Sequence, residues 1–475
     1  MSENVLNSYD NPLLNTYLTF KRGIGTGDNN RFLRYWHEIH LTNSNLYDTN
    51  FNEHKWQKYN KGGAFRKWYG NREYVINWQN NGDEVRNNYS AEGKQASRPQ
   101  NLQYNFLPNI SYSSLTSGDI SFRVYLGFLN DQAGNFFVGS EENLYLLLPF
   151  LNSNTATYFL KIKNNTLNIT ADDLNNIPIA SLVESELSTI CQNNISISKE
   201  EWNTRETSWD FKQNELIRLN DRNLENSYHQ YTKYWTEQFV TLHAHEEELN
   251  RQFIDIYGLQ DELTPEVSFE DITLLKDEVK IVGGKLEFQP KEIMQQLVSY
   301  AVGCMFGRYS LDKEGLILAN TGDTLEDYIQ QLAECGKEPS LIPDEDNIIT
   351  ILDNEWFADD IVAYFNEFMT VCFGEENLRE NMNFLLDALG RKSIREYFVR
   401  DFYADHIQRY QKRPIYWMFS SPQRSFRVLV YLHRYTPDTL NEILNNYLRE
   451  FIEKLNNQLK LQENISSTST GREQA

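Results

Sequence analysis

The spacing of hydrophobic and polar residues divides the chain into a mixed front part and a mainly helical rear part. In the front part, short apolar runs at 110–115 and 121–126 predict strands. A longer run at 144–151 follows two glutamates and predicts a short helix with an acidic first turn, although Pro149 would interrupt it. We therefore expect a mixed α/β domain over residues 1–185.

A long helix is predicted next, because apolar residues recur three, four or seven positions apart between residues 228 and 256. The stripe consists of Tyr228, Tyr231, Trp235, Phe239, Leu242, Leu249, Phe253 and Ile256. Gly258 is a plausible end for this helix. Such a stripe is more typical of core packing than of a ligand site, so we interpret residues 186–262 as a helical spacer.

Helical periodicity returns after Pro265 and the acidic segment 266–278, and it predicts a mostly helical, acidic domain over residues 263–460. The expected helices cover 293–306, 325–335, 357–373, 378–389, 394–405 and 440–459. Residues 461–475 are rich in Ser, Thr, Gly and Gln, which predicts a disordered tail. The predicted fold class of the whole chain is α+β.

The charge distribution limits which part of the chain can meet nucleic acid. The formal net charge is −22, which argues against a simple free-standing DNA-binding protein. However, residues 1–110 contain 13 Lys and Arg against 10 Asp and Glu, whereas the remainder contains 32 against 57. A mildly basic front and an acidic rear predict that only the front meets phosphate.

No apolar run is long enough to span a membrane, and the first residues lack the basic and apolar regions of a signal peptide. The four cysteines lie far apart and match no disulfide or zinc spacing. We therefore expect a cytoplasmic protein with no membrane partner.

Residues 54–82 interleave cations with aromatic residues around a pair of glycines. The segment contains Lys55, Lys58, Lys61, Arg66 and Lys67, together with Trp56, Tyr59, Phe65, Trp68 and Tyr69, and the pair Gly62 and Gly63. Cations neutralise phosphates, aromatic rings stack on bases, and glycines permit close approach of the backbone. The pattern favours a DNA-binding surface, although a ligand-free β-rich surface can carry the same mixture.

A glycine-rich loop at residues 22–31 precedes this segment. A nucleotide-binding turn of this type requires a helix to follow, but the next residues are aromatic and of ambiguous period. The favoured interpretation is a polar loop that touches DNA backbone or base edges through Thr26, Asp28, Asn29, Asn30 and Arg31.

The sequence contains no convincing catalytic or metal-binding pattern. His243 and His245 are two residues apart, so they do not share a helix face as zinc ligands would. No two prolines are adjacent anywhere, which excludes the Asn-Pro-Pro-aromatic loop that holds a flipped adenine in adenine-N6 methyltransferases. A convincing glycine-rich S-adenosylmethionine loop is also absent. We therefore predict no catalytic residue, no metal and no cofactor site in this chain.

Several motifs resemble the target-recognition part of the PglX family, the adenine-specific DNA methyltransferases of BREX phage-defence systems. They are GTGDNNRF at 25–32, YNKGG and FRKWYG within 59–70, and NNIPI at 175–179. Later motifs at 206–211, 253–259, 299–310 and 412–417 are similar to that family's later segments, so the resemblance runs from about residue 10 to about residue 435. The segment that ends at 179 also resembles the close of recognition domains in type I specificity subunits and type IIG enzymes.

The resemblance implies double-stranded DNA as a partner, and other BREX proteins besides. PglX-like proteins begin with a large S-adenosylmethionine-binding domain, and this sequence resembles only their later part. S-adenosylmethionine is therefore expected for the complete enzyme, with a catalytic domain either supplied by another polypeptide or lost. Whether the chain alone is an enzyme stays open. The alternatives are a non-catalytic scaffold of a defence complex or a protein like a type I specificity subunit, and a nuclease is the least favoured.

Overall fold

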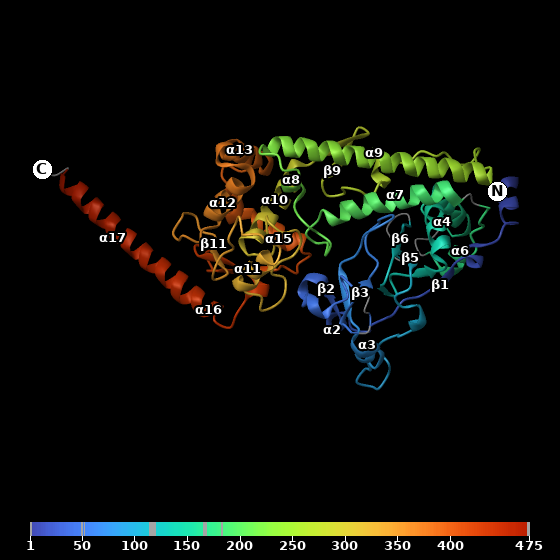
Figure 1. The fold of residues 1–475 in the computed structure, drawn as a ribbon, viewed down its shortest axis with the longest axis horizontal. Helices are drawn as coiled ribbons and strands as arrows, with labels where there is room; N and C mark the ends of the chain where they lie inside the picture. Colours follow the sequence, from blue (N-terminus) through green and yellow to red (C-terminus); the bar gives the residue numbers. More distant parts are fainter. Residues whose placement is uncertain are drawn as a thin grey trace. The chain divides into compact units, whose positions relative to one another are not determined.

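The computed structural model describes residues 2–48, 51, 53–113, 120–164, 169–181 and 184–472. The chain forms two compact units (Figure 1). Unit 1 consists of residues 1–211 and 230–289, and unit 2 consists of residues 212–229 and 290–475. Helices and several small sheets occur together, which confirms the predicted α+β class.

The first sheet of unit 1 is antiparallel and has the strand order β1-β8-β5-β6. Its strands are β1 (Thr19–Lys21), β8 (Phe136–Val138), β5 (Asn109–Tyr112) and β6 (Phe122–Tyr125). The last two confirm the strands predicted near 110 and 121, while residues 114 and 115 lie outside the described part. Helix α4 (Glu141–Leu151) packs on β5 and β6 and continues through Pro149, which lies in its last turn.

The second sheet of unit 1 has the order β2-β4-β3-β7. Its strands are β2 (Leu33–Tyr35), β4 (Tyr74–Asn77), β3 (Trp56–Asn60) and β7 (Leu129–Asn130). Leu33 pairs with Ile76 in the antiparallel β2–β4 ladder. Because α2 (Asn29–Phe32) ends where β2 begins and α3 (Gln79–Arg86) follows β4, both short helices lie at the same end of this sheet (Figure 1).

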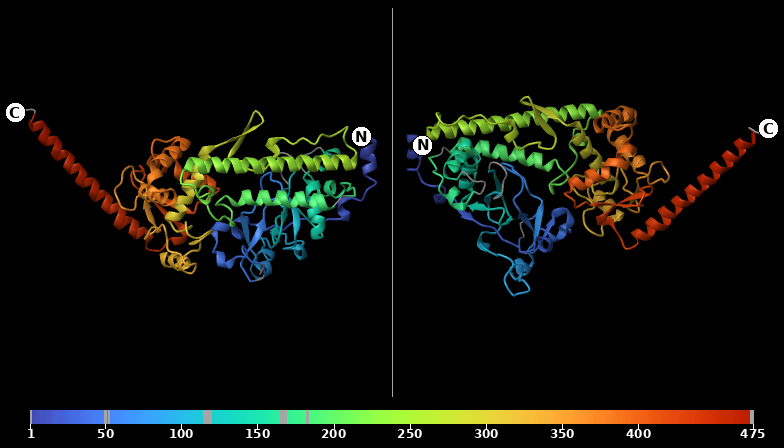
Figure 2. Two further views of the ribbon diagram at one scale, coloured as in Figure 1. Left: turned by 45° about the horizontal axis from the view of Figure 1, so that its top comes forward. Right: turned by 180° about the vertical axis from the view of Figure 1, so that it is seen from behind.

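Two long helices form the helical layer of unit 1, and they run side by side in all views (Figures 1 and 2). They are α7 (Glu184–Asn203) and α9 (Leu224–Tyr257), of which residues 230–257 belong to this unit. The predicted stripe is buried from Tyr231 to Phe253. Helix α9 stops at Tyr257, and Gly258 adopts a φ of +64°, which confirms the predicted end.

The remaining elements of unit 1 are short. They are α1 (Glu3–Ser8), α5 (Asn154–Lys163), α6 (Ala171–Asn175) and a hairpin of β9 (Val279–Val282) and β10 (Lys285–Phe288). The sequence places a boundary at residue 262, but residues 263–289 group with unit 1. One reason is that Phe288 packs edge-on against Tyr231 of α9.

Unit 2 combines helices with a small antiparallel sheet of order β11-β13-β12. The strands are β11 (Ile348–Thr350), β13 (Arg427–Tyr431) and β12 (Tyr416–Ser420). The helices are α8 (Glu215–Arg218), α10 (Pro290–Met305), α11 (Leu325–Ala333), α12 (Ile361–Phe373), α13 (Leu378–Leu389), α14 (Ile394–Tyr397), α15 (Tyr403–Arg409), α16 (Thr439–Glu442) and α17 (Arg449–Arg472).

The helices predicted for the rear of the chain are present in unit 2, but its sheet is not predicted by the sequence. The central strand β13 is buried along its whole length, so it shows none of the alternation that marks a half-exposed strand. Helix α17 continues to Arg472 and so enters the tail that the composition predicts as disordered, while residues 473–475 lie outside the described part. Among the described helices, none is both long and apolar enough to cross a membrane.

Candidate nucleic-acid interface

Three residues of the cation–aromatic segment, Lys67, Trp68 and Tyr69, lie in the interior of unit 1. Lys67 Nζ donates a hydrogen bond of 2.6 Å to Glu246 Oε2, and Trp68 Nε1 donates one of 2.8 Å to Glu246 Oε1. Trp68 is fully buried and has a φ of +69°. Tyr69 is also buried, and the Arg72 guanidinium lies 3.7 Å from the centre of its ring. These side chains therefore connect the sheets to helix α9.

Arg66 makes a second connection, to helix α7. Its guanidinium forms an ion pair with Glu201 and lies 4.9 Å from the ring of Trp202. Glu201 also pairs with Arg205 at 3.0 Å, and Arg205 pairs with Glu278 at 3.2 Å. We call Arg66, Lys67 and Trp68, with Glu201 and Glu246, the helix clamp. Buried carboxylates neutralise both cations, and the Arg66 and Lys67 side chains are only 14% and 11% exposed, so the clamp joins the sheets to the two long helices of unit 1.

The other three lysines of the segment, Lys55, Lys58 and Lys61, lie in different environments. Lys61 Nζ donates to Asp131 Oδ2 at 3.1 Å. Burial lowers the pKa of Lys58, and the nearby Arg72 adds to this effect. Lys55 lies 5.5 Å from the ring of Trp56, and the Arg34 guanidinium lies 5.9 Å from the same ring. Lys55 and Arg34 thus form a half-buried cation–aromatic cluster at the surface.

The predicted glycine pair forms the turn after β3. Gly62 has a φ of +80° and Gly63 a φ of +139°, values that favour glycine. The Gly62 N–H donates to Asn60 Oδ1 at 3.0 Å, and the Gly63 carbonyl accepts from Ser113 Oγ at 2.9 Å. The pair is therefore used to turn the chain.

The predicted polar loop at residues 26–31 is mostly exposed. Thr26 is buried and donates to Asn29 Oδ1 at 2.7 Å, and Asp28 caps α2 by accepting from the Arg31 N–H at 3.1 Å. The side chains of Asn29, Asn30 and Arg31 reach solvent, and Arg31 pairs with Glu84 of α3 at 3.1 Å. The helix that follows has only four residues, so the loop does not resemble a nucleotide-binding turn.

A second segment, residues 86–104, packs along this loop. Gly25 and Arg98 exchange backbone hydrogen bonds of 3.1 and 2.7 Å, and Asn88 Nδ2 donates to the Thr26 carbonyl at 3.0 Å. A Cβ at Gly27 would lie 2.6 Å from the backbone of Ala96, so glycine permits the close approach. The pairing brings Arg86, Lys94 and Arg98, all exposed, to the predicted loop. The local sequence pattern does not indicate these three cations, because the contacts that bring them to the loop join residues far apart in the sequence.

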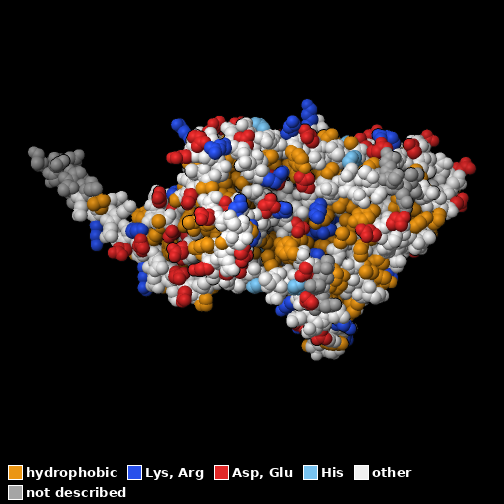
Figure 3. Space-filling view, viewed as in Figure 1, with side chains coloured by type: hydrophobic (Ala, Val, Ile, Leu, Met, Phe, Trp, Pro, Cys, Tyr) orange, Lys and Arg blue, Asp and Glu red, His pale blue; other side chains and the backbone are white. Residues whose placement is uncertain are grey.

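We define the basic edge as the cations on these segments and the neighbouring strands, namely Arg22, Arg31, Arg34, Lys55, Arg86, Lys94 and Arg98. Four carboxylates, Asp28, Asp83, Glu84 and Glu92, belong to the same segments or to α3, so the edge has more cations than carboxylates but is mixed in charge. Figure 3 shows Lys, Arg, Asp and Glu side chains intermixed at the lower end of unit 1. Beyond residue 110, unit 1 contains 10 Lys and Arg against 25 Asp and Glu. The basic edge therefore contrasts with the acidic remainder of its own unit.

The described residues contain no group of three or more His, Cys, Asp or Glu side chains arranged to hold a metal ion. The two histidines considered from the sequence have other partners. His243 Nε2 lies 2.8 Å from the Val267 carbonyl, and His245 Nδ1 lies 2.7 Å from Asn194 Oδ1. Both therefore contribute to packing around α9.

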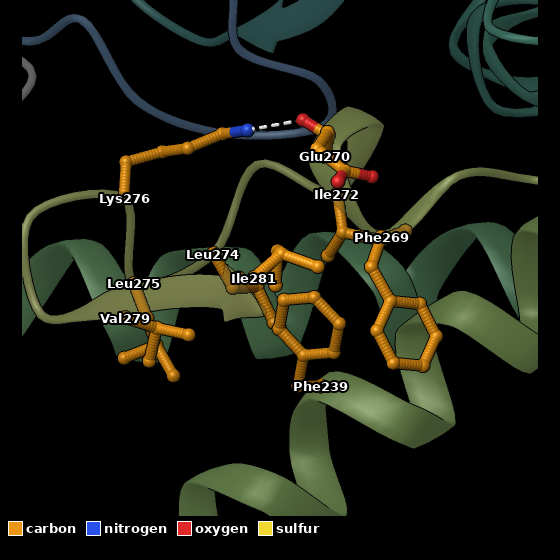
Figure 4. Close-up of a pocket in the computed structure, with 9 residues that line it drawn as sticks. All are labelled: Phe239, Phe269, Glu270, Ile272, Leu274, Leu275, Lys276, Val279 and Ile281. Carbon is orange, nitrogen blue, oxygen red and sulfur yellow. Dashed lines mark hydrogen bonds between the residues drawn. The ribbon is translucent and has the colours of Figure 1, made fainter. Parts of the chain in front are cut away.

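A small pocket lies between α9 and the base of the β9–β10 hairpin (Figure 4). Its volume is about 230 Å³, and it is lined by Phe239, Phe269, Glu270, Ile272, Leu274, Leu275, Lys276, Val279 and Ile281. Lys276 Nζ donates to the Glu270 carbonyl at 2.5 Å. The lining is mainly aliphatic and aromatic, and the pocket is below the size usual for sites that hold a drug-sized ligand. This pocket is therefore a packing feature of unit 1 and carries no assignment of a ligand.

Unit 2 contains a cluster of three carboxylates bonded to tyrosines. Tyr447 donates to Asp346 Oδ2 at 2.7 Å and lies 2.9 Å from Asp359 Oδ2, and Tyr364 donates to Asp344 Oδ2 at 3.0 Å. Burial, with the nearby Asp346 carboxylate, raises the pKa of Asp344 from 3.8 to about 7. The cluster fixes the start of the last helical segment, and nothing in it indicates a ligand.

The raised pKa of Asp344 predicts a pH dependence of stability. Folded unit 2 binds a proton at Asp344 more tightly than the unfolded chain does, so the free energy of unfolding should fall by on the order of 2 kcal/mol as the pH rises from about 4 to about 7. Asp344→Asn should flatten this dependence in denaturant titrations. Asp353→Asn, at a side chain that is 75% exposed, should leave it unchanged. A steep dependence that persists in Asp344→Asn would contradict this assignment.

No protein-family model matches the sequence. Two relatives do match. The adenine-specific methyltransferase PglX of Lacticaseibacillus casei (strain Zhang) is 37% identical over 485 residues, and the adenine-specific methyltransferase BrxX of Escherichia coli O9:H4 (strain HS) is 33% identical over 471 residues. These matches cover 97% and 92% of this chain but only 39% and 38% of the relatives' own length. The chain is therefore homologous to one part of the PglX and BrxX adenine-specific methyltransferases, as its motifs predict.

Proposed function

We propose that unit 1 recognises the DNA target of an adenine-specific methyltransferase of a BREX phage-defence system. The observation that carries the proposal is the basic edge. Two segments about seventy residues apart in sequence are joined by backbone hydrogen bonds, and their pairing gathers exposed cations in an otherwise acidic unit. The similarity to PglX and BrxX supplies the reaction that such recognition would serve.

In this proposal the cations of the basic edge neutralise DNA phosphates and release the counterions bound there. Arg34 and Lys55 both lie against the ring of Trp56, and Arg31 is held by Glu84, so these groups are positioned before DNA arrives. The acidic remainder of unit 1 repels phosphate, which favours one orientation of the duplex. Phosphate contacts position the protein, and the exposed polar side chains nearby read the bases.

Methyl transfer itself is assigned to another module. The sequence has no adjacent prolines, and the chain matches only 39% and 38% of the length of PglX and BrxX, so we propose that a separate domain or polypeptide binds S-adenosylmethionine and methylates the adenine. Double-stranded DNA, that catalytic module and other BREX proteins are the proposed partners.

The proposal is tested by DNA binding of the full chain with the triple substitution Arg31→Ala, Arg86→Ala and Arg98→Ala. Each lost phosphate contact should reduce the slope of log K against log salt by about 0.9, so the triple variant should lose about 3 in slope and bind at least tenfold more weakly. Fluorescence anisotropy of a labelled duplex across a salt series measures both quantities.

The matched control is Lys212→Ala, Arg218→Ala and Arg222→Ala, three exposed cations of unit 2. This variant should keep the wild-type slope. Equal slopes for the two triple variants would remove the basic edge from the proposal. A wild-type chain that does not bind duplex DNA at all would favour instead a non-catalytic interaction subunit, for which the excess of 32 Asp and Glu over 22 Lys and Arg in unit 2 supplies an acidic docking surface.

A further inference from the structure

The start of helix α3 contains an unusual left-handed turn. Asn80, Asn81 and Gly82 all have positive φ, at 52°, 58° and 74°, with ψ between 28° and 46°. Asparagine visits this region more readily than other residues with a side chain, but normally as a single residue and not in succession. A run of three therefore has a conformational cost, and such backbone persists where its surroundings fix it, often at functional sites.

The surroundings of the turn do fix it. The Gly82 N–H donates to the Trp78 carbonyl at 3.0 Å, and a Cβ at Gly82 would lie 2.7 Å from the Trp78 ring. Trp78 belongs to the buried core of the second sheet. On the other side, Asn77 accepts from the Gln79 N–H at 3.3 Å and donates to Glu84 at 3.3 Å. The turn is thus held against the sheet by Trp78, and Asn77 links it to Glu84 of α3.

The anchored turn presents three amide side chains to solvent. Gln79, Asn80 and Asn81 are exposed, and within the described part of the chain none of their side-chain amides has a hydrogen-bond partner. By contrast, Asn77 and Asn88 nearby are both bonded within the protein. The strained backbone therefore holds free donor–acceptor groups outward.

The amides lie beside the basic edge. Glu84, on the same helix, pairs with Arg31, and α3 ends at Arg86. When cations bind the phosphates on both sides of a DNA groove, protein side chains next to those cations are positioned against the base edges in the groove.

We propose that Gln79, Asn80 and Asn81 form a base-reading turn that selects adenine in the major groove, an inference that rests on the proposed DNA recognition by unit 1. An Asn or Gln amide accepts from adenine N6 and donates to adenine N7 at the same time, a pairing that no other base offers in the major groove. A rigid turn suits this task because the amides lose little freedom on binding.

The test replaces the amides without disturbing the turn. Glycine adopts positive φ freely, so Asn80→Gly and Asn81→Gly together remove two amides and should leave the fold intact, which thermal unfolding checks. Full-length wild-type and variant chains are each used to select binders from a library of duplexes with a random core, and the enriched sequences are compared. The matched control is Asn220→Gly, an exposed Asn of unit 2 with a φ of 53°.

We expect the wild type and the Asn220→Gly control to enrich the same adenine-containing sequence. The double variant should lose about 10- to 100-fold in affinity for that sequence while it keeps its affinity and salt slope on unrelated DNA. Unchanged selection by the double variant, or wild-type binding without any sequence preference, would overturn the base-reading turn and leave DNA binding by the basic edge standing. Absence of all DNA binding by the wild type would overturn both.

Discussion

Replacing Lys67 by methionine is expected to destabilise unit 1 by about 3–5 kcal/mol. The substitution leaves the Glu246 carboxylate, whose side chain is 4% exposed, without the cation that lies 2.6 Å from it. Trp68 Nε1 still donates to Glu246, but one neutral donor does not compensate a buried charge. Denaturant titration of the full chain measures the shift in the transition of unit 1.

The double variant Lys67→Met with Glu246→Gln is the decisive companion. The glutamine carbonyl keeps an acceptor for Trp68 and carries no charge, so most of the lost stability should return. Arg251→Ala breaks an exposed pair with Glu248 on the same helix and should cost less than about 1 kcal/mol. If Lys67→Met alone behaves like Arg251→Ala, then Lys67 is not a member of the helix clamp and returns to the candidates for phosphate contact.

The second large effect is expected in unit 2, from Arg395→Met. The Arg395 guanidinium donates two hydrogen bonds, of 2.8 and 2.9 Å, to the Asp360 carboxylate, whose side chain is 1% exposed. Asp360 also caps helix α12 by accepting from the Val362 N–H at 2.9 Å. Loss of the arginine leaves a buried carboxylate with only backbone donors, at an expected cost of about 3–5 kcal/mol.

Arg400→Met is the control for unit 2. Arg400 pairs with Glu396, which lies on α14 next to Arg395, but the Arg400 side chain is 66% exposed. It should cost less than about 1 kcal/mol. Hydrogen exchange separates the two large effects, since Lys67→Met should speed exchange in α7 and α9 and Arg395→Met should speed exchange in α12 and α14. Faster exchange across the whole chain in either variant would mean that the two units unfold together.

Periodicity predicted the helices well because it reports directly on which face is buried. The stripe of α9 from Tyr231 to Phe253 is buried as expected, and Gly258 ends the helix. The sequence did not predict the sheet of unit 2, because its central strand has no exposed face and so no periodic pattern. Strand β13 is buried on both faces, so its residues form a continuous apolar run, which by itself does not distinguish a strand from a helix.

The candidate site was predicted in part. Residues whose surroundings are set by near neighbours in the sequence were predicted correctly, whereas residues with partners far away in the sequence were not. Asn29, Asn30 and Arg31 are exposed as expected because their loop is fixed by local contacts such as the Asp28 cap. Lys67 and Lys94 look alike in sequence, yet Lys67 meets a carboxylate 179 residues away while Lys94 is exposed. A cation's availability for DNA depends on such distant partners, which a local pattern does not contain.

The chain leaves unit 1 after Phe211, re-enters it within α9 and leaves again after Gln289. A fragment that stops near residue 185 would consequently lack Glu201 and Glu246, and the clamp cations Arg66 and Lys67 would lose their carboxylate partners. The basic edge and the base-reading turn, however, both lie within the first hundred or so residues. Under the proposed function, exchanging those loops between homologues while the two long helices stay constant should change the DNA site that is bound.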